Sequence, residues 1–206
     1  MNHLLATINN EMSAVIQRAQ QSLVQVQNGR RGNGAGTIWH GDGLILTNAH
    51  VVQRRQPQVT LWDGRSYPSQ LLAYDEKRDL AALAIQAGDL PTVELGNAKT
   101  LRAGDWVIAA GHPWGITGAV SAGAVIAMGM PLELPHYPGE LIQVGLQLRP
   151  GHSGGPLVDG HGRLLGINTM IAGPQVGLVI PVHIVAAFLK ENLGHAARAE
   201  TAVQYA

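Results

Sequence analysis

The stretch Gly151-His152-Ser153-Gly154-Gly155-Pro156-Leu157-Val158 decides the fold. It places a serine among glycines, where the backbone can turn tightly and a ligand can approach the chain closely. The apolar pair at its end runs into Asp159-Gly160, a dipeptide that favours a tight hairpin turn, and a second apolar run at 163–171 follows. The pattern predicts a loop, a strand, a turn and an antiparallel strand.

The serine allows more than one interpretation. It can be an exposed side chain in a glycine-rich hairpin. The spacing Gly151-x-Ser153-x-Gly155 also matches the nucleophile elbow of α/β-hydrolases, but that elbow leads from a strand into a helix. Here a strand-like run follows the serine, and Asp159 is too close in sequence to supply the acid of such a site. The sequence therefore disfavours an elbow.

Strand-like segments extend on both sides of this stretch. Short apolar runs bounded by Gly, Pro and Asp are typical of strands. They cover two series separated by a connector at 88–104: first 23–27, 36–39, 44–47, 58–62, 66–74 and 80–85, then 106–111, 118–128, 140–144, 155–158, 163–171 and 176–180. We predict an all-β fold of two six-stranded antiparallel β-barrels with short N- and C-terminal helices, and a ligand site in the cleft between the barrels.

Helical spacing marks both ends of the chain. A helix that starts at Asn10 or Ser13 and runs to about Gln21 has one apolar face, which would dock on the body or on a second subunit and is formed by Met12, Val15, Ile16 and Ala19. A second helix starts at Pro181, where the missing N–H is harmless. The predicted parts are an N-terminal helical segment at 1–21, a first barrel at 22–100, a second barrel with its helix at 101–193, and a tail at 194–206.

Composition excludes several classes of function. The 14 Lys and Arg residues balance 14 Asp and Glu residues, so no excess of positive charge is present to hold a nucleic acid. The absence of Cys excludes disulfides, a thiolate nucleophile and a cysteine metal site. The nine His residues show no His-Glu-x-x-His spacing and no accompanying carboxylate cluster. We expect neither a metal nor a cofactor.

The sequence shows no targeting or membrane segment. Residues 1–11 lack the basic start of a signal peptide. The longest nearly apolar run, 178–189, contains Pro181 and His183 and is too short to span a bilayer. We expect no membrane span and a cytoplasmic location, or a periplasmic or other extracytoplasmic one if a leader has been removed.

Three residues form a set that can carry chemistry. His50 follows the apolar strand at 44–47, Asp79 precedes the strand at 80–85, and Ser153 lies in the second barrel. Each alone has a structural explanation, as a packed histidine, a turn aspartate or a loop serine. Together they match a nucleophile that needs a neutral imidazole to take its proton and a carboxylate to orient that imidazole. Asp75 is a nearby alternative to Asp79.

The chain resembles the chymotrypsin-like serine proteases, and in particular their HtrA/Deg branch. The resemblance covers about residues 22–182, and its motifs are Gly43-Leu44-Ile45-Leu46-Thr47-Asn48-Ala49-His50-Val51-Val52, Asp79-Leu80-Ala81, Gly111-His112-Pro113-Trp114-Gly115, Gly151-His152-Ser153-Gly154-Gly155-Pro156 and Gly166-Ile167-Asn168-Thr169. It implies that His50 is the general base, that Asp79 orients it and that Ser153 attacks the scissile carbonyl. The N–H groups of Gly151 and Ser153 would form the oxyanion hole.

The sequence departs from the family pattern in three respects. His152 stands where typical HtrA proteins have Asn. The run 142–148 lacks the Thr-Asp-Ala of the family, and we expect a pocket for small or medium aliphatic side chains, formed by Leu146, Leu148, Asn168, Thr169 and Met170. We also expect no PDZ domain.

The resemblance predicts a serine endopeptidase that cleaves unfolded or extended polypeptides through a Ser153 acyl-enzyme. Such relatives assemble into trimers through their N-terminal segment, so we expect a possible homotrimer here. One alternative is a latent or inactive protease fold that binds polypeptides in a chaperone-like way, with an oxyanion loop collapsed around His152. Another is an esterase that uses the same three residues.

Overall fold

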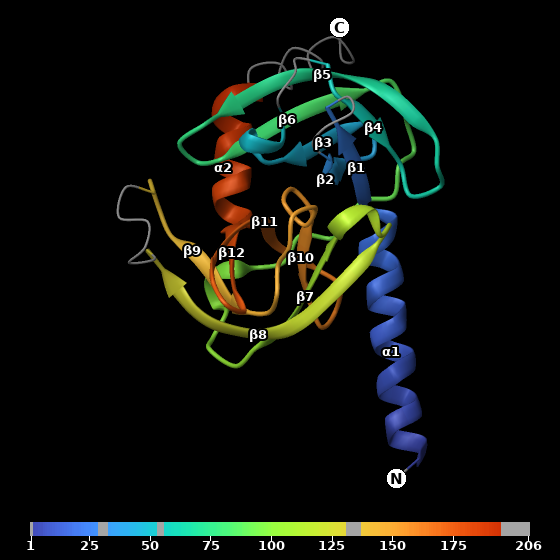
Figure 1. Ribbon diagram of the computed structural model, residues 1–206, viewed down its shortest axis with the longest axis vertical. Helices are drawn as coiled ribbons and strands as arrows, with labels where there is room; N and C mark the ends of the chain where they lie inside the picture. Colours follow the sequence, from blue (N-terminus) through green and yellow to red (C-terminus); the bar gives the residue numbers. More distant parts are fainter. Residues whose placement is uncertain (1, 29–32, 53–55, 131–136, 195–206) are drawn as a thin grey trace, which may run out of the picture.

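The computed structural model describes residues 2–28, 33–52, 56–130 and 137–194. The chain forms two closed antiparallel β-barrels with strand orders β1-β2-β3-β6-β5-β4 and β10-β11-β12-β9-β8-β7 (Figure 1). The predicted fold class is therefore confirmed. The first barrel comprises β1 (Leu23–Gln27), β2 (Asn33–His40), β3 (Leu44–Thr47), β4 (Gln58–Thr60), β5 (Ser66–Asp75) and β6 (Leu80–Ile85).

The second barrel follows the first in the sequence. It comprises β7 (Trp106–Gly111), β8 (Ala119–Gly129), β9 (Leu141–Gly145), β10 (Pro156–Asp159), β11 (Leu164–Gly173) and β12 (Val176–Pro181). Short 3₁₀ turns lie between strands at η1 (Ala49–Val51), η2 (Ala98–Thr100) and η3 (Pro113–Gly115). In the turn from β10 to β11, the left-handed residue is Gly162, with φ 82°, and not the predicted Gly160.

The N-terminal helix is longer than predicted. Helix α1 (Asn2–Gln21) has 20 residues, because nothing before Asn10 breaks a helix: the segment contains no Pro or Gly. Its last turns dock on the second barrel, where Val15 and Ala19 are buried in the core. Its first half extends away from both barrels (Figure 1).

The C-terminal helix lies at the junction of the two barrels. Helix α2 (Val182–Leu193) starts one residue later than predicted, since Pro181 still has extended backbone and ends β12. Phe188 and Val185 are buried in one cluster with Leu46 and Leu80 of the first barrel and Ile180 of the second. This shared core joins the barrels on the side of α2. The predicted tail from 194 lies, beyond Gly194, outside the described residues. None of the described helices is long and apolar enough to cross a membrane.

Hydrogen bonds also join the barrels directly, next to Ser153. The N–H of Ala35 in β2 donates to the carbonyl oxygen of Ser153 at 2.8 Å. The hydroxyl of Thr37 donates to the carbonyl oxygen of Gly154 at 3.0 Å. Gly154 has φ 89°, and a Cβ there would lie 2.0 Å from the Ala35 carbonyl oxygen. Only glycine fits at this contact, which holds the Ser153 loop against the first barrel.

We predict that Gly154→Ala lowers the free energy of unfolding by about 2 to 4 kcal/mol, because the added methyl group meets backbone and the left-handed φ is strained. Gly160→Ala is the matched control, since a Cβ at Gly160 meets nothing within 4 Å. It should change stability by less than about 0.5 kcal/mol. Urea unfolding of both variants measures the difference, and equal midpoints would contradict the proposed packing constraint.

Candidate active site

His50 lies where the first barrel faces the second. It follows β3 in the 3₁₀ turn η1, which the extended residue Asn48 precedes. Asn48 is buried, and its side-chain amide donates to the backbone carbonyl of Asp79 at 2.9 Å. The His50 side chain is half exposed. The turn after β3 therefore presents the His50 imidazole to solvent, and the buried Asn48 anchors that turn to the backbone of Asp79.

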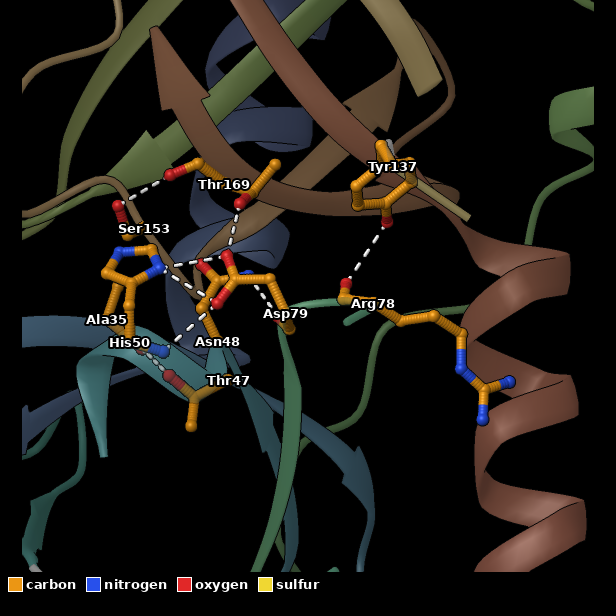
Figure 2. A network of polar contacts seen from close by, with 9 residues as sticks. All are labelled: Ala35, Thr47, Asn48, His50, Arg78, Asp79, Tyr137, Ser153 and Thr169. Atoms are coloured by element: carbon orange, nitrogen blue, oxygen red, sulfur yellow. Dashed lines mark hydrogen bonds and ion pairs between the residues drawn. The ribbon is translucent and has the colours of Figure 1, made fainter. Parts of the chain in front are cut away.

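Asp79 directs its carboxylate at that imidazole. The Nδ1 atom of His50 lies 3.0 Å from Oδ1 and 2.8 Å from Oδ2 of Asp79, and the His50 backbone N–H donates to Oδ1 at 3.0 Å. The Thr169 hydroxyl, from the second barrel, donates to Oδ2 (Figure 2). Asp79 has φ 55°, a left-handed conformation that Asp tolerates better than most residues. A buried carboxylate on Nδ1 places the proton there and leaves the lone pair on Nε2.

Asp75, the sequence alternative to Asp79, is engaged elsewhere. Its carboxylate accepts from the backbone N–H of Arg78 at 2.9 Å and from Arg78 Nε at 2.5 Å. Arg78 also donates to Glu191 of α2, and its backbone carbonyl accepts from the Tyr137 hydroxyl. These contacts anchor the loop just before Asp79, and Figure 2 shows the one between Tyr137 and Arg78. Of the two aspartates, Asp79 alone contacts His50.

Ser153 stands beside the imidazole but is not bonded to it. Its hydroxyl donates to the backbone carbonyl of Thr169 at 2.8 Å, and Figure 2 shows its side chain next to the His50 ring. Within the described residues no hydrogen bond joins Ser153 to His50. Rotation about the Cα–Cβ bond of Ser153 would bring its hydroxyl toward the ring, a change between ordinary rotamers. Catalytic hydrogen bonds are often unformed until substrate binds.

The turn before Ser153 leaves two backbone donors unpaired. The N–H of His152 donates to the carbonyl of Arg149 at 2.9 Å, and Gly151 between them has φ 106°. Pro followed by a left-handed Gly defines a type II β-turn. Within the described residues the N–H groups of Gly151 and Ser153 donate to no protein atom. They can therefore donate hydrogen bonds to a ligand oxygen that carries negative charge.

A cavity of about 310 Å³ opens beside these groups. Of the predicted pocket residues, Leu148, Thr169 and Met170 line it, together with His50 and Ser153. Sequence reasoning missed several other lining residues: Gly34, Val51, Arg149, Pro150 and Ile171. Ile171 directly follows the predicted pocket residue Met170 in β11, and this adjacency in sequence could have identified it as a lining residue.

Two of the predicted pocket residues do not line the cavity. Leu146 is buried in the core of the second barrel, close to Gly123. Asn168 is fully buried, and its amide donates to the carbonyls of Ala110 and Pro156. Side chains alternate between the two faces of a strand, so Asn168 points into the barrel while its neighbour Thr169 faces the site. Among the described residues no cluster of three metal-ligating side chains occurs.

Residues 34–167 match the trypsin-like peptidase domain. The chain belongs to this family. Like other trypsin-like peptidases, it has two barrels, with the candidate catalytic residues brought together from both. The match spans His50, Asp79 and Ser153.

Several similar proteins are HtrA-type members of the trypsin-like peptidases. The chain is 38% identical over 164 residues to serine protease HTRA2, mitochondrial, of Drosophila pseudoobscura pseudoobscura, an overlap of 77% of this chain and 38% of that protein. It is 40% identical over 159 residues to the putative serine protease HhoA of Synechocystis sp., an overlap of 73% of this chain and 40% of that protein. A structure titled HtrA-type protease AlgW with tripeptide matches with a TM-score of 0.83 and 32% identity, covering 90% of this chain and 64% of that one.

These findings confirm the resemblance to the HtrA branch. The chain spans about two fifths of the length of the curated relatives that it matches.

Burial perturbs a histidine near the turn. His112 is 4% exposed, and burial is the main reason that its pKa falls to about 4; the Val24 backbone opposes this shift and nearby His152 adds to it. Between pH 6.5 and pH 4, His112 is therefore protonated in the unfolded chain but neutral in the folded chain. The stability that His112 contributes is complete above pH 6.5 and is lost as the pH falls toward 4.

We predict that this histidine makes the wild-type protein less stable in acid. At about 1.4 kcal/mol per pH unit, the free energy of unfolding should fall by about 3 kcal/mol between pH 7.5 and pH 4 because of His112. His112→Asn should lack this part of the loss, whereas His40→Asn, at an exposed histidine, should retain it. Urea midpoints at several pH values test this, and parallel curves for wild type and His112→Asn would contradict it.

Proposed function

We propose that the protein is a serine endopeptidase of the HtrA type. The observation that carries the proposal is the contact of the Asp79 carboxylate with His50 Nδ1, at 2.8 Å, next to a serine whose loop presents two unpaired N–H groups. The Ser153 hydroxyl attacks the substrate carbonyl carbon and gives its proton to His50 Nε2. The N–H groups of Gly151 and Ser153 stabilise the negative oxygen.

Two bond cleavages complete the reaction. The tetrahedral intermediate collapses with loss of the amine, which takes the proton from His50, and leaves an acyl group on Ser153. Water then attacks this ester, gives a proton to His50, and releases the acid as the proton returns to Ser153. Asp79 holds the imidazole in place and stabilises its charged form throughout.

The unpaired N–H groups favour this proposal over the latent alternative. A collapsed oxyanion loop would turn the Gly151 N–H away from the serine, and the left-handed φ of Gly151 together with its unpaired N–H supports the open arrangement instead. An esterase would use the same groups. Comparing the rates at which the protein hydrolyses peptide and ester substrates distinguishes an endopeptidase from an esterase.

We predict that a fluorophosphonate labels the wild-type protein once per chain, since the probe requires an activated serine and an oxyanion hole but no known substrate. Ser153→Ala should take up no label, and labelling of His50→Ala should be at least about a thousandfold slower. Ser66→Ala, at an exposed serine of the first barrel, is the control and should behave like wild type. Intact mass spectrometry reads out all four proteins. A folded wild type that remains unlabelled would refute the proposal.

The pocket favours small or medium aliphatic side chains before the cleaved bond. Leu148 lines the cavity and packs on Gly177, where an added Cβ would lie 2.8 Å from Leu148 Cγ. Arg149 lines the same cavity, and its charge disfavours a substrate Lys or Arg. We propose that the substrates are unfolded or extended polypeptides, because the cavity opens directly to solvent beside the barrels.

We predict that Leu148→Ala shifts selectivity toward larger side chains by about tenfold, as expected for the removal of a few methyl groups from an apolar pocket. The measurement is the ratio of kcat/KM for peptides with Leu and Ala before the cleaved bond. Leu146→Ala is the matched control, because it removes the same atoms from the core without touching the cavity. An unchanged ratio for Leu148→Ala would exclude it from the specificity pocket.

We also propose a homotrimer joined through α1. The sequence favoured the face at 12–19, but Val15 and Ala19 are buried against the second barrel. The face available to a partner is farther along the helix, where Leu5 and Ile8 are 58% and 48% exposed. Apolar side chains on a protruding helix are stabilised when they pack against another surface.

We predict a mass in solution of three times the chain mass of 21.8 kDa. The double variant Leu5→Glu, Ile8→Glu should be monomeric, whereas Asn10→Glu, on the opposite helix face, should keep the trimer. Light scattering measures all three. A monomeric wild type would refute the trimer.

A further inference from the structure

Two imidazoles lie buried at the turn that presents the Gly151 N–H. His152 ends the turn and His112 follows β7; they are 2% and 4% exposed. Gly111 packs on His152, since an added Cβ would lie 2.6 Å from His152 Cα and 3.1 Å from its ring atom Cδ2. The backbone N–H of His112 donates to the carbonyl of Gly151 at 2.8 Å. Both histidines thus hold the peptide unit between Gly151 and His152, which directly follows the unit that carries the Gly151 N–H.

Each ring accepts a backbone N–H through its Nδ1 atom. In His112 the donor is Gly118, at 3.2 Å. In His152, Nδ1 lies 3.2 Å from both the N–H and the carbonyl oxygen of Arg149. The carbonyl already accepts the His152 N–H, while the Arg149 N–H has no other partner within the described residues. The ring therefore accepts from Arg149, and a lone pair on Nδ1 alongside a proton on Nε2 exists only in the neutral imidazole.

The surroundings oppose a positive charge on either ring. The Nε2 atoms of both histidines are buried without a hydrogen-bond partner. In the described part of the chain, the charged and titratable groups that act on the two rings are Arg149 and the rings themselves, with no carboxylate among them. Burial is the main cause of the lowered pKa of His152; the Arg149 backbone opposes this shift and its guanidinium charge adds to it.

We propose that His152 and His112 are positioning residues that hold the oxyanion turn only while both rings are neutral. Acid then withdraws the Gly151 N–H from the oxyanion hole through a protonation separate from that of His50. This inference rests on the proposed function, because the oxyanion hole matters only to acyl transfer.

The step needs only a proton from solvent. Protonation of His152 at Nδ1 replaces the lone pair by an N–H, so the Arg149 N–H loses its acceptor. The charged ring is then left with the Arg149 carbonyl oxygen, 3.2 Å from Nδ1, which already accepts the His152 N–H. Protonation of His112 at Nδ1 likewise removes the acceptor of the Gly118 N–H. An Asn side chain can accept these N–H groups through its amide oxygen and does not titrate. Asn at both positions should therefore keep the turn closed in acid, whereas a single Asn removes one of the two protonations.

The test is the rate of fluorophosphonate labelling between pH 8 and pH 4 for wild type, for His152→Asn and His112→Asn, and for the double variant that carries both substitutions. Each rate is divided by the same protein's rate at pH 8, and circular dichroism at every pH reports the fold. The comparison isolates the two rings, because the general base is the same in all four proteins. The wild-type rate should fall more steeply toward pH 4 and end at least about tenfold below the double variant, because loss of one oxyanion donor costs about a hundredfold or more.

His40→Asn is the matched control, because it removes an exposed histidine far from the turn, and it should follow wild type. Superimposable normalised profiles for wild type and the double Asn variant would overturn the inference while leaving the serine hydrolase intact. Unfolding of wild type over the pH range of the steeper fall would also overturn it, since acid would then act on the whole fold. A folded wild type that takes up no label at pH 8 would refute the proposed function and this inference together.

Discussion

The bonds from Ala35 and Thr37 to the carbonyl oxygens of Ser153 and Gly154 are the contacts on which the rest of the site depends. His50 and Asp79 come from one barrel and Ser153 from the other, so their mutual positions are only as rigid as the barrel junction. Close approach of two backbones at Gly154 removes the space in which the serine loop could shift. Thr169 reinforces this junction from the second barrel, since its hydroxyl binds Asp79 and its carbonyl binds Ser153.

The oxyanion turn shows how the fold maintains an unfavourable local arrangement. Two N–H groups without protein partners cost free energy unless a ligand or water binds them. The turn keeps this arrangement because Pro150 restricts its backbone and Gly151 adopts the left-handed φ. Its other polar groups are bonded: Trp114 donates to the Pro150 carbonyl, His112 to the Gly151 carbonyl, and His152 bonds with Arg149. Groups that are preorganised in this way need little rearrangement when charge develops on a substrate oxygen. The histidines connect that preorganisation to the protonation state of the protein.

Sequence reasoning succeeded where the signal was local. The strands at 23–27, 44–47, 80–85 and 106–111 have the predicted bounds, because short apolar runs between turn residues define a strand over a few residues. It failed at the start of α1, where weak helix formers do not stop a helix that has no Pro or Gly. It also failed for Asn168, because only the orientation of β11 in its barrel decides which face of the strand borders the cavity. It failed for Leu146 because the chain just beyond the end of β9 turns that side chain into the core of the second barrel.

The sequence by itself determined the all-β architecture, the order of the motifs and the choice of His50 and Ser153 as candidate residues, because these depend on local periodicity and on residue types that few other chemistries require. Only the tertiary structure decided that Asp79 and not Asp75 contacts His50, that Thr169 joins the two barrels, and that His112 and His152 lie buried side by side at the oxyanion turn. These relations join residues that are distant in sequence. They follow from barrel closure and from the burial of polar groups, and neither can be read from the amino-acid sequence alone.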